Sequence, residues 1–105
     1  MFVNVAVYRI RPEHVEAFKQ RMLQRAETCI RVEKNCLRFE VNQSRDDPTR
    51  FLMYEVFHGP EDFQTHIDSP HTQDFAKTRD TNGWLAERSV YQLDQLFPPA
   101  GWKMR

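Results

Sequence analysis

Two histidines in one short segment are the first candidates for chemistry in this sequence. His66 and His71 lie five positions apart in HIDSPHTQDF, with Ser69-Pro70 between them. An imidazole titrates close to neutral pH, so either side chain could take a proton from a substrate and return it. The spacing also fits a helix boundary, because Ser69 is a good N-cap and Pro70 a good first helical residue. We therefore expect one helix to end, and another to begin, between the two imidazoles.

The two imidazoles are expected to face different surroundings. On the first of these helices His66 shares a face with Phe63 and Ile67, so it should point toward a sheet and is the candidate acid/base. A core-edge histidine hydrogen-bonded to backbone is an equal alternative. His71 lies in the first turn of the next helix, where free backbone N–H groups attract anions, so it could bind an anionic part of a substrate. A solvated first-turn residue is the slightly favoured alternative.

Tyr54 and Glu55 are adjacent polar residues in an otherwise apolar strand, RFLMYEVF. Such a strand is covered on both faces and should be central, and its adjacent residues face opposite sides. The Tyr54 hydroxyl could polarise a substrate carbonyl, which makes it a second catalytic candidate, although a core role is the commoner one. A buried carboxylate needs a partner. Arg38 on the neighbouring strand, or an arginine of a second subunit, could pair with Glu55, and a structural ion pair is its favoured role.

Aromatic side chains are expected to line a pocket near His66. Removing a proton from a phenol, an enol or a hydroxyketone needs a base and a pocket that excludes water. The pocket should draw on Phe39, Phe51, Phe57 and Phe63. The predicted substrate-binding residues are His71, Glu55, Arg38, Phe51 and Phe39.

No metal or cofactor site is expected from the spacing of the possible ligands. Cys29 and Cys36 are seven positions apart, which matches no metal or redox motif, so both should be small buried thiols. His58, His66 and His71 with a carboxylate could in principle bind zinc. The five-residue gap is wrong for two ligands on one helix face, however, and no cysteine joins them. Neither a phosphate-binding loop nor a dinucleotide fingerprint is present.

The elements that would position these residues follow from the changes in hydrophobic period. Residues 2–10, 36–43, 50–57 and 87–97 read as strands, 12–34 as a long helix, and 58–68 and 69–81 as two short helices. The order βαββαβ predicts an α+β, ferredoxin-like fold, with one antiparallel sheet and its helices on one face. We expect Asn4, Ala6 and Tyr8 on the open face, covered by a second copy of the chain.

Composition limits the classes of partner. The chain has 105 residues, which indicates one domain over 1–105, with 98–105 as a tail. Acidic and basic residues balance at 15 each, so nucleic acid is not an expected partner. No apolar run is long enough to span a membrane, and the N-terminus lacks the features of a signal peptide, so the expected location is the cytoplasm.

Three segments in order, NCLRFEVNQS, RFLMYEVF and FQTHIDSPHTQDF, resemble the antibiotic biosynthesis monooxygenase (ABM) family of dimeric α+β barrels. The resemblance extends from the first strand to about Phe97. It implies a homodimer and a cofactor-independent monooxygenase that takes a proton from a small quinol-like or enolisable substrate. Haem-degrading members of the family carry a Trp in the short helix and a His ten residues on. At the corresponding positions this chain has His66 and Ala76, so the proximal ligand is missing and haem is not expected as a cofactor.

Two other functions remain compatible with the resemblance. The pattern is similar to the branch that isomerises phosphorylated autoinducer-2, so an isomerase of a small phosphorylated hydroxyketone is one alternative. A non-catalytic dimeric module that binds a ligand is the other.

Overall fold

The computed structural model describes residues 1–99 and has the strand and helix order expected from the sequence. The elements are β1 (Phe2–Ile10), a 3-10 turn η1 (Pro12–His14), α1 (Val15–Val32), β2 (Cys36–Gln43), β3 (Arg50–Phe57), α2 (Pro60–Asp68), α3 (Pro70–Thr81) and β4 (Leu85–Asp94). Most of the predicted tail lies outside the described residues. No helix within residues 1–99 combines the length and the apolar character that crossing a membrane requires.

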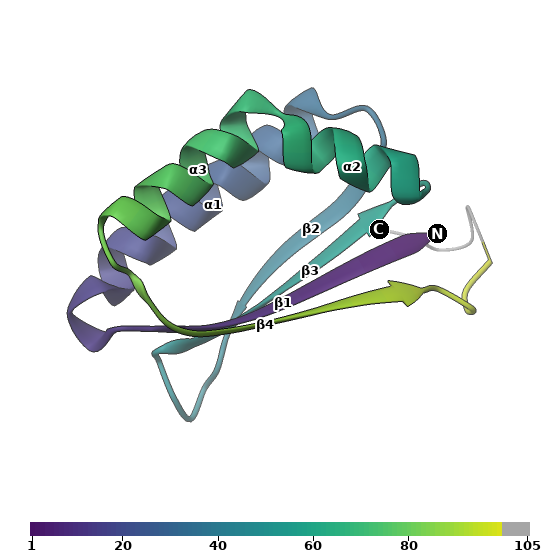
Figure 1. Cartoon of the computed structure of the whole chain (residues 1–105). Coiled ribbons are helices and arrows are strands. Elements are labelled where there is room, and N and C mark those ends of the chain that lie inside the picture. The colour runs from purple at the N-terminus through teal and green to yellow at the C-terminus, as the bar shows by residue number, and fades with distance from the viewer. Residues whose placement is uncertain (100–105) are drawn as a thin grey trace.

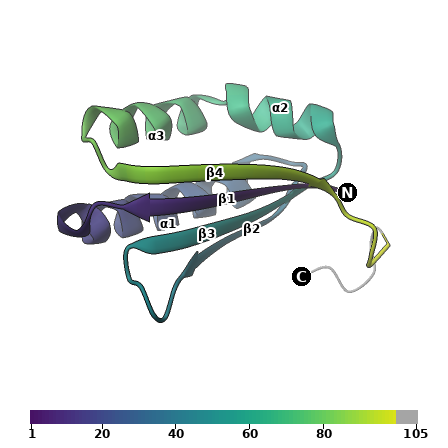
Figure 2. The same cartoon turned by 60° about the horizontal axis from the view of Figure 1, so that its bottom comes forward.

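The four strands form one antiparallel sheet in the order β2-β3-β1-β4. All three α-helices lie on the same side of it, and the other face carries no helix (Figures 1 and 2). The expected α+β, ferredoxin-like fold with a central β3 is therefore confirmed. The edge strand β4 is mostly exposed on both faces. A hollow can consequently form between α2, α3 and this edge of the sheet.

The strand β1 faces the opposite way from the prediction. Asn4 pairs with Glu55, and Tyr8 pairs with Phe51, so these residues and Ala6 point toward the helices. The expectation that they lie on the open face is wrong, because β1 is apolar on both faces and alternation alone does not say which face is inside. The Asn4 amide donates to Glu55 at 3.4 Å, and the Tyr8 hydroxyl accepts from Arg79 at 2.9 Å.

Phe18 on α1 is the centre of the aromatic core under the helices. Its ring centroid lies 4.8 Å from that of Phe51, 6.2 Å from Trp84 and 6.3 Å from Phe75. The side chain is fully buried. These contacts pack α1 and α3 against the sheet, and the resulting core supports the polar residues on the helix-facing side of β1.

A bulge at the start of β2 changes which residues face the core. The pairing with β3 shifts between Cys36 and Arg38, so one extra residue is inserted. Cys36 is buried beside Phe57, whereas Leu37 is 38% exposed. The predicted alternation is therefore wrong for the first two residues, because Cys36 and not Leu37 lies on the core side with Phe39; from Arg38 on it is as predicted.

Candidate functional site

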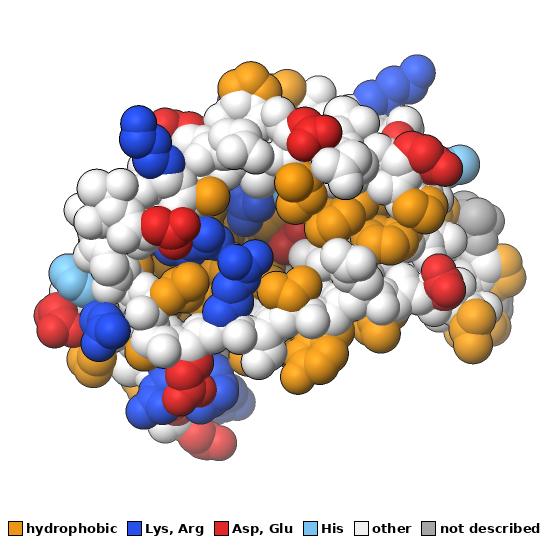
Figure 3. All heavy atoms as spheres, viewed as in Figure 1, with side chains coloured by type: hydrophobic (Ala, Val, Ile, Leu, Met, Phe, Trp, Pro, Cys, Tyr) orange, Lys and Arg blue, Asp and Glu red, His pale blue; other side chains and the backbone are white. Residues whose placement is uncertain are grey.

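A cavity of about 260 Å³ lies between the helices and the β1–β4 side of the sheet. Figure 3 shows it as a hollow between the helices and the nearest strand, with basic side chains at one end and an acidic side chain deep inside. The charged lining residues are His66 on α2, Glu55 on β3, and Arg25, Arg79 and Arg88 from three different elements. This cavity brings the candidate base together with polar groups from both the sheet and the helices.

Local sequence explains how His66 reaches this cavity. Gly59 caps α2, where its N–H donates to the Asp62 carboxylate at 3.0 Å, and Pro60 is the first helical residue. His66 then falls on the inner face and is only 1% exposed. Its ring packs against Phe57, with centroids 5.0 Å apart, and stacks on Phe63. The predicted direction, toward the sheet, is what the structure has.

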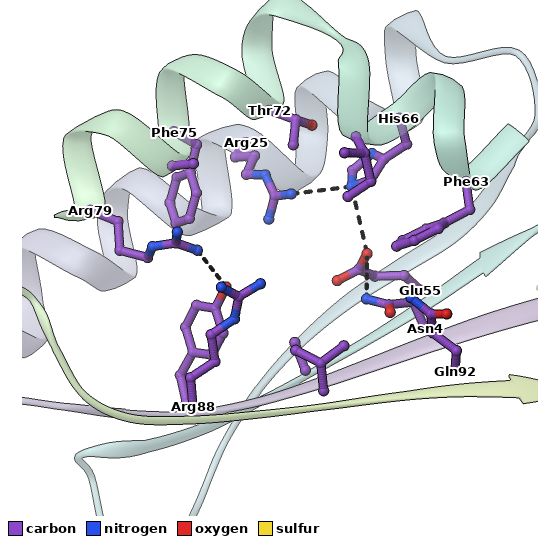
Figure 4. A pocket seen from close by; sticks show the side chains of 15 residues that line it. Asn4, Arg25, Glu55, Phe63, His66, Thr72, Phe75, Arg79, Arg88 and Gln92 are labelled. Carbon is purple, nitrogen blue, oxygen red and sulfur yellow. Dashed lines mark hydrogen bonds and ion pairs between the residues drawn. The ribbon is translucent and has the colours of Figure 1, made fainter.

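The partners of His66 determine where its proton lies. Arg25 Nη2 lies 3.1 Å from His66 Nε2, and a guanidinium can only donate, so Nε2 accepts. On the other side of the ring, Nδ1 lies 2.9 Å from Glu33 Oε2, and an ionised carboxylate can only accept, so Nδ1–H donates. This arrangement places the ring proton on Nδ1 and leaves the lone pair on Nε2, the nitrogen nearer the cavity, where it accepts the hydrogen bond from Arg25 (Figure 4).

Glu33, just after α1, contacts the candidate base and was not predicted from the sequence. It also accepts a hydrogen bond from His71 Nε2, so one carboxylate joins both imidazoles. Burial opposes ionisation of Glu33, but the hydrogen bonds from His66 and His71 outweigh it, and the pKa of the carboxyl lies below its ordinary value. His71 does not line the cavity. It sits in the first turn of α3, as predicted, beside the Ser69 hydroxyl at 3.2 Å.

Glu55 lies at the bottom of the cavity, 3% exposed. Its Oε1 is 3.7 Å from His66 Nε2. Burial raises the pKa of this carboxyl, and the nearby Arg25 only partly opposes the shift. The predicted pairing with Arg38 is wrong, because Arg38 faces the other side of the sheet and forms its ion pair with Glu40. Within the described chain Arg25 is the cation that balances Glu55.

The remaining predicted site residues lie outside the cavity lining. Tyr54 pairs with Val5 and Glu40 and points to the open face, away from His66. Phe51 is buried in the aromatic core. Phe39 does not line the cavity but packs against a residue that does: the Arg25 guanidinium lies 5.2 Å from its ring centroid. The aromatic residues that do line the cavity are Tyr8, Phe63 and Phe75.

Three arginines give the cavity a positive end. Arg25 is held over the Phe75 ring at 4.7 Å, and Arg79 donates to the Tyr8 hydroxyl. Arg88 extends from β4 toward Arg79 (Figure 4). Three buried polar atoms of lining residues, Asn4 Oδ1, Arg25 Nε and Thr72 Oγ1, have no hydrogen-bond partner among residues 1–99; the first can only accept, and the other two can donate to a ligand oxygen. Such groups are costly to leave unsatisfied, so the cavity is suited to an anionic, oxygen-rich ligand.

Comparisons with known proteins agree with this architecture. Residues 1–78 match the family profile for antibiotic biosynthesis monooxygenases. A Nitrosomonas europaea protein with the same family description is 33% identical, with 92% of this chain and 100% of that chain covered and a TM-score of 0.83. No curated protein matches the sequence.

Two further solved structures are similar in fold alone. One is from Pseudomonas aeruginosa, at 23% identity, with 90% and 93% of the two chains covered and a TM-score of 0.81. The other is from Deinococcus radiodurans, at 18% identity, with 90% and 92% covered and the same TM-score. The profile match and the Nitrosomonas relative both confirm the resemblance drawn from the sequence. The chain belongs to the antibiotic biosynthesis monooxygenase (ABM) family.

Proposed function

We propose that the cavity is the active site of a cofactor-independent enzyme that takes a proton from a small, anionic, enolisable substrate. The observation that carries the proposal is the position of His66. Its unprotonated Nε2 lies beside Arg25 and Glu55, while Glu33 holds the opposite nitrogen. A carboxylate that orients a histidine and stabilises its cation is the arrangement that makes an imidazole an effective base.

The surrounding groups suit the anion that proton removal creates. A phenol or enol that loses its proton to His66 becomes an electron-rich anion, and Arg25 lies within reach to stabilise that charge. In the oxygenase reaction the anion itself supplies electrons to molecular oxygen. The walls formed by Phe63 and Phe75 would limit access of water to it. Oxygenation of a quinol-like substrate is therefore the first candidate reaction.

The arginines favour a second candidate from a different class. Arg79 and Arg88 lie at the end of the cavity away from His66 (Figure 4), where a phosphate or carboxylate would bind. Arg79 already donates to the Asp80 carboxylate from Nε and Nη2, so Arg88 would supply most of the charge. An isomerase of a small phosphorylated hydroxyketone would use this end for the phosphate. His66 would then remove the proton from the hydroxyl-bearing carbon and return it to the former carbonyl carbon, while the hydroxyl proton moves to the carbonyl oxygen. In this proposal the anion-binding role predicted for His71 would belong to Arg79 and Arg88 instead.

A homodimer formed through the open face of the sheet is part of the same proposal. That face carries Val5, Val7, Leu52, Tyr91 and Leu93, and the last three are 38–55% exposed. An apolar sheet face of this kind is commonly buried by a second copy of the same chain. It is the face without helices in Figure 2. The cavity lies on the opposite face and stays open in such a dimer.

Oxygen uptake and anaerobic turnover separate the candidate reactions. The protein is incubated with quinols that do and do not carry a carboxylate, and oxygen consumption is recorded. A phosphorylated hydroxyketone is tested without oxygen, and its conversion is followed by NMR. Oxygen consumption with a quinol supports the oxygenase. Conversion of the phosphate ester alone supports the isomerase. Binding of these compounds without turnover of any would contradict the enzyme proposal and favour a ligand-binding module.

A further inference from the structure

Four potential metal ligands meet at the ring nitrogen of His66 that faces away from Arg25. Cys29, Glu33, His66 and His71 each offer one donor atom, and all four atoms lie within 4.8 Å of one another. Cys29 and Glu33 are one helical turn apart at the end of α1, while the histidines come from α2 and α3. We propose that these four side chains form a binding site for a divalent transition-metal ion of the zinc type.

The donor set selects the class of ion. One sulfur, one carboxylate oxygen and two imidazole nitrogens are ligands of zinc and its neighbours, whereas calcium and magnesium require oxygen ligands. Zn–N and Zn–S distances imply tetrahedral edges of about 3.3–3.7 Å. The His66 Nδ1 to Cys29 Sγ distance is 3.8 Å, and Nδ1 to Glu33 Oε2 is 2.9 Å. The largest separation exceeds a tetrahedral edge by about 1 Å, which side-chain rotation can close.

Charge balance favours an ion at this buried position. Cys29 is 0% exposed, and the Glu33 side chain is 9% exposed. A divalent cation bound by one thiolate, one carboxylate and two neutral imidazoles gives a site with no net charge, which lowers the cost of burial. Binding releases one proton, from the Cys29 thiol. The hydrogen bonds that now join Glu33 to both histidines would be exchanged for bonds to the ion.

The second ring nitrogen of His66 has a suitable partner in the loaded state. With the ion on Nδ1, the ring proton lies on Nε2, so His66 does not act as the proposed base while the ion is bound. That proton needs an acceptor, which Arg25 cannot be. Glu55 Oε1, 3.7 Å from Nε2, is close enough to accept after a small movement. A carboxylate behind a metal-bound histidine is the usual arrangement around zinc.

The cluster also has a route to solvent. A second cavity, of about 290 Å³, is lined by Glu33, Cys36, Ser69 and His71 and lies apart from the one containing Arg25. The His71 side chain is 19% exposed at this opening. An ion could therefore reach the four ligands without passing through the proposed active site.

Cobalt titration of tag-free, chelator-treated protein tests the site. Co²⁺ occupies zinc sites and gives a thiolate charge-transfer band in the near ultraviolet when a cysteine binds it. We expect one equivalent to bind with this band, and zinc to displace it. Cys29→Ser should abolish the band, and His71→Ala should weaken binding at least about tenfold through loss of a ligand.

Two matched variants control for general effects. Cys36→Ser changes the other buried thiol, and His58→Ala removes an imidazole outside the cluster; both should bind Co²⁺ as the unaltered protein does. Circular dichroism establishes that each variant is folded. A folded, unaltered protein that takes up neither Co²⁺ nor Zn²⁺, or a Cys29→Ser protein that keeps the band, would overturn the proposal. Because no readout depends on turnover, that failure would leave the proposed reaction untouched.

Discussion

Glu33 Oε2 lies 2.9 Å from His66 Nδ1, although the two residues are separated by 33 positions and lie on either side of the β2–β3 hairpin in the chain. The contact fixes which ring nitrogen carries the proton and turns the other toward the cavity. It also separates the two roles assigned to the histidines in the sequence. In the proposed reaction His66 is the base, while His71 donates to the same carboxylate from outside the cavity.

The tautomer of His66 is the first prediction. In metal-free protein, a long-range proton–nitrogen NMR spectrum should show Nδ1 protonated and Nε2 unprotonated at neutral pH. Glu33→Gln removes the charge that orients the ring, so kcat should fall about 10²-fold, while KM changes little because Glu33 does not touch the substrate. Glu27→Gln, at an exposed site on α1, is the control. A protonated Nε2 in the unaltered protein would refute the assignment.

Arg88 is predicted to act on substrate binding rather than on chemistry. It is exposed on β4 and reaches the cavity end where Arg79 lies. For an anionic substrate, Arg88→Ala should raise KM about tenfold, equivalent to about 1.4 kcal/mol, with kcat nearly unchanged. Arg9→Ala removes an exposed arginine that pairs with Glu87, and it should leave both constants as they are. Equal effects of the two substitutions would argue against a specific anion site.

The open sheet face should control the oligomeric state. Leu93→Lys places a charge on this face, so light scattering should show a shift from a dimer toward the 12.6 kDa monomer. Leu23 on α1 is exposed to a similar degree but lies on the helical side, and Leu23→Lys should not change the mass. A monomeric unaltered protein, or equal masses for both variants, would exclude the proposed interface.

Phe18 should dominate the stability of the core. Phe18→Ala leaves a cavity among Phe51, Phe75 and Trp84, so the free energy of unfolding should fall by roughly 3–5 kcal/mol. Urea unfolding measures this loss. Leu23→Ala, at a side chain 52% exposed, should change the free energy by less than about 0.5 kcal/mol. A small loss for Phe18→Ala would mean that the aromatic cluster is not the main core.

The sequence predicts the fold well because its hydrophobic periodicity is strong and its helix-capping residues are easy to recognise. The Ser69-Pro70 boundary is such a case, since the Ser69 side chain accepts from the Thr72 N–H and Pro70 begins α3. The sequence does not reveal which face of β1 packs against the helices, because valines occupy one face while Ala6 and Tyr8 occupy the other. The bulge at Leu37 likewise leaves no local signal in the sequence.

The site was predicted only in part because its residues are brought together by packing. His66 was found from its helical face, and Glu55 from its position on an apolar strand. Arg25, Arg79 and Arg88 lie on three elements and share no motif. The Cys29–Glu33 pair could have been found, since a spacing of four places both on one helix face. The expectation that no cysteine joins the histidines is wrong, because Cys29 Sγ lies 3.8 Å from His66 Nδ1.

The most direct test of the central claim is the turnover rate of a His66→Asn protein on the best substrate found by oxygen uptake or anaerobic NMR. His66→Asn keeps a polar side chain at the same buried position but removes the imidazole that would act as the base. If His66 takes the proton, kcat should fall by about 10²–10⁴-fold in a protein with an unchanged circular dichroism spectrum, while His58→Asn should keep full activity. Unchanged turnover by folded His66→Asn protein would contradict the assignment of this cavity as the active site.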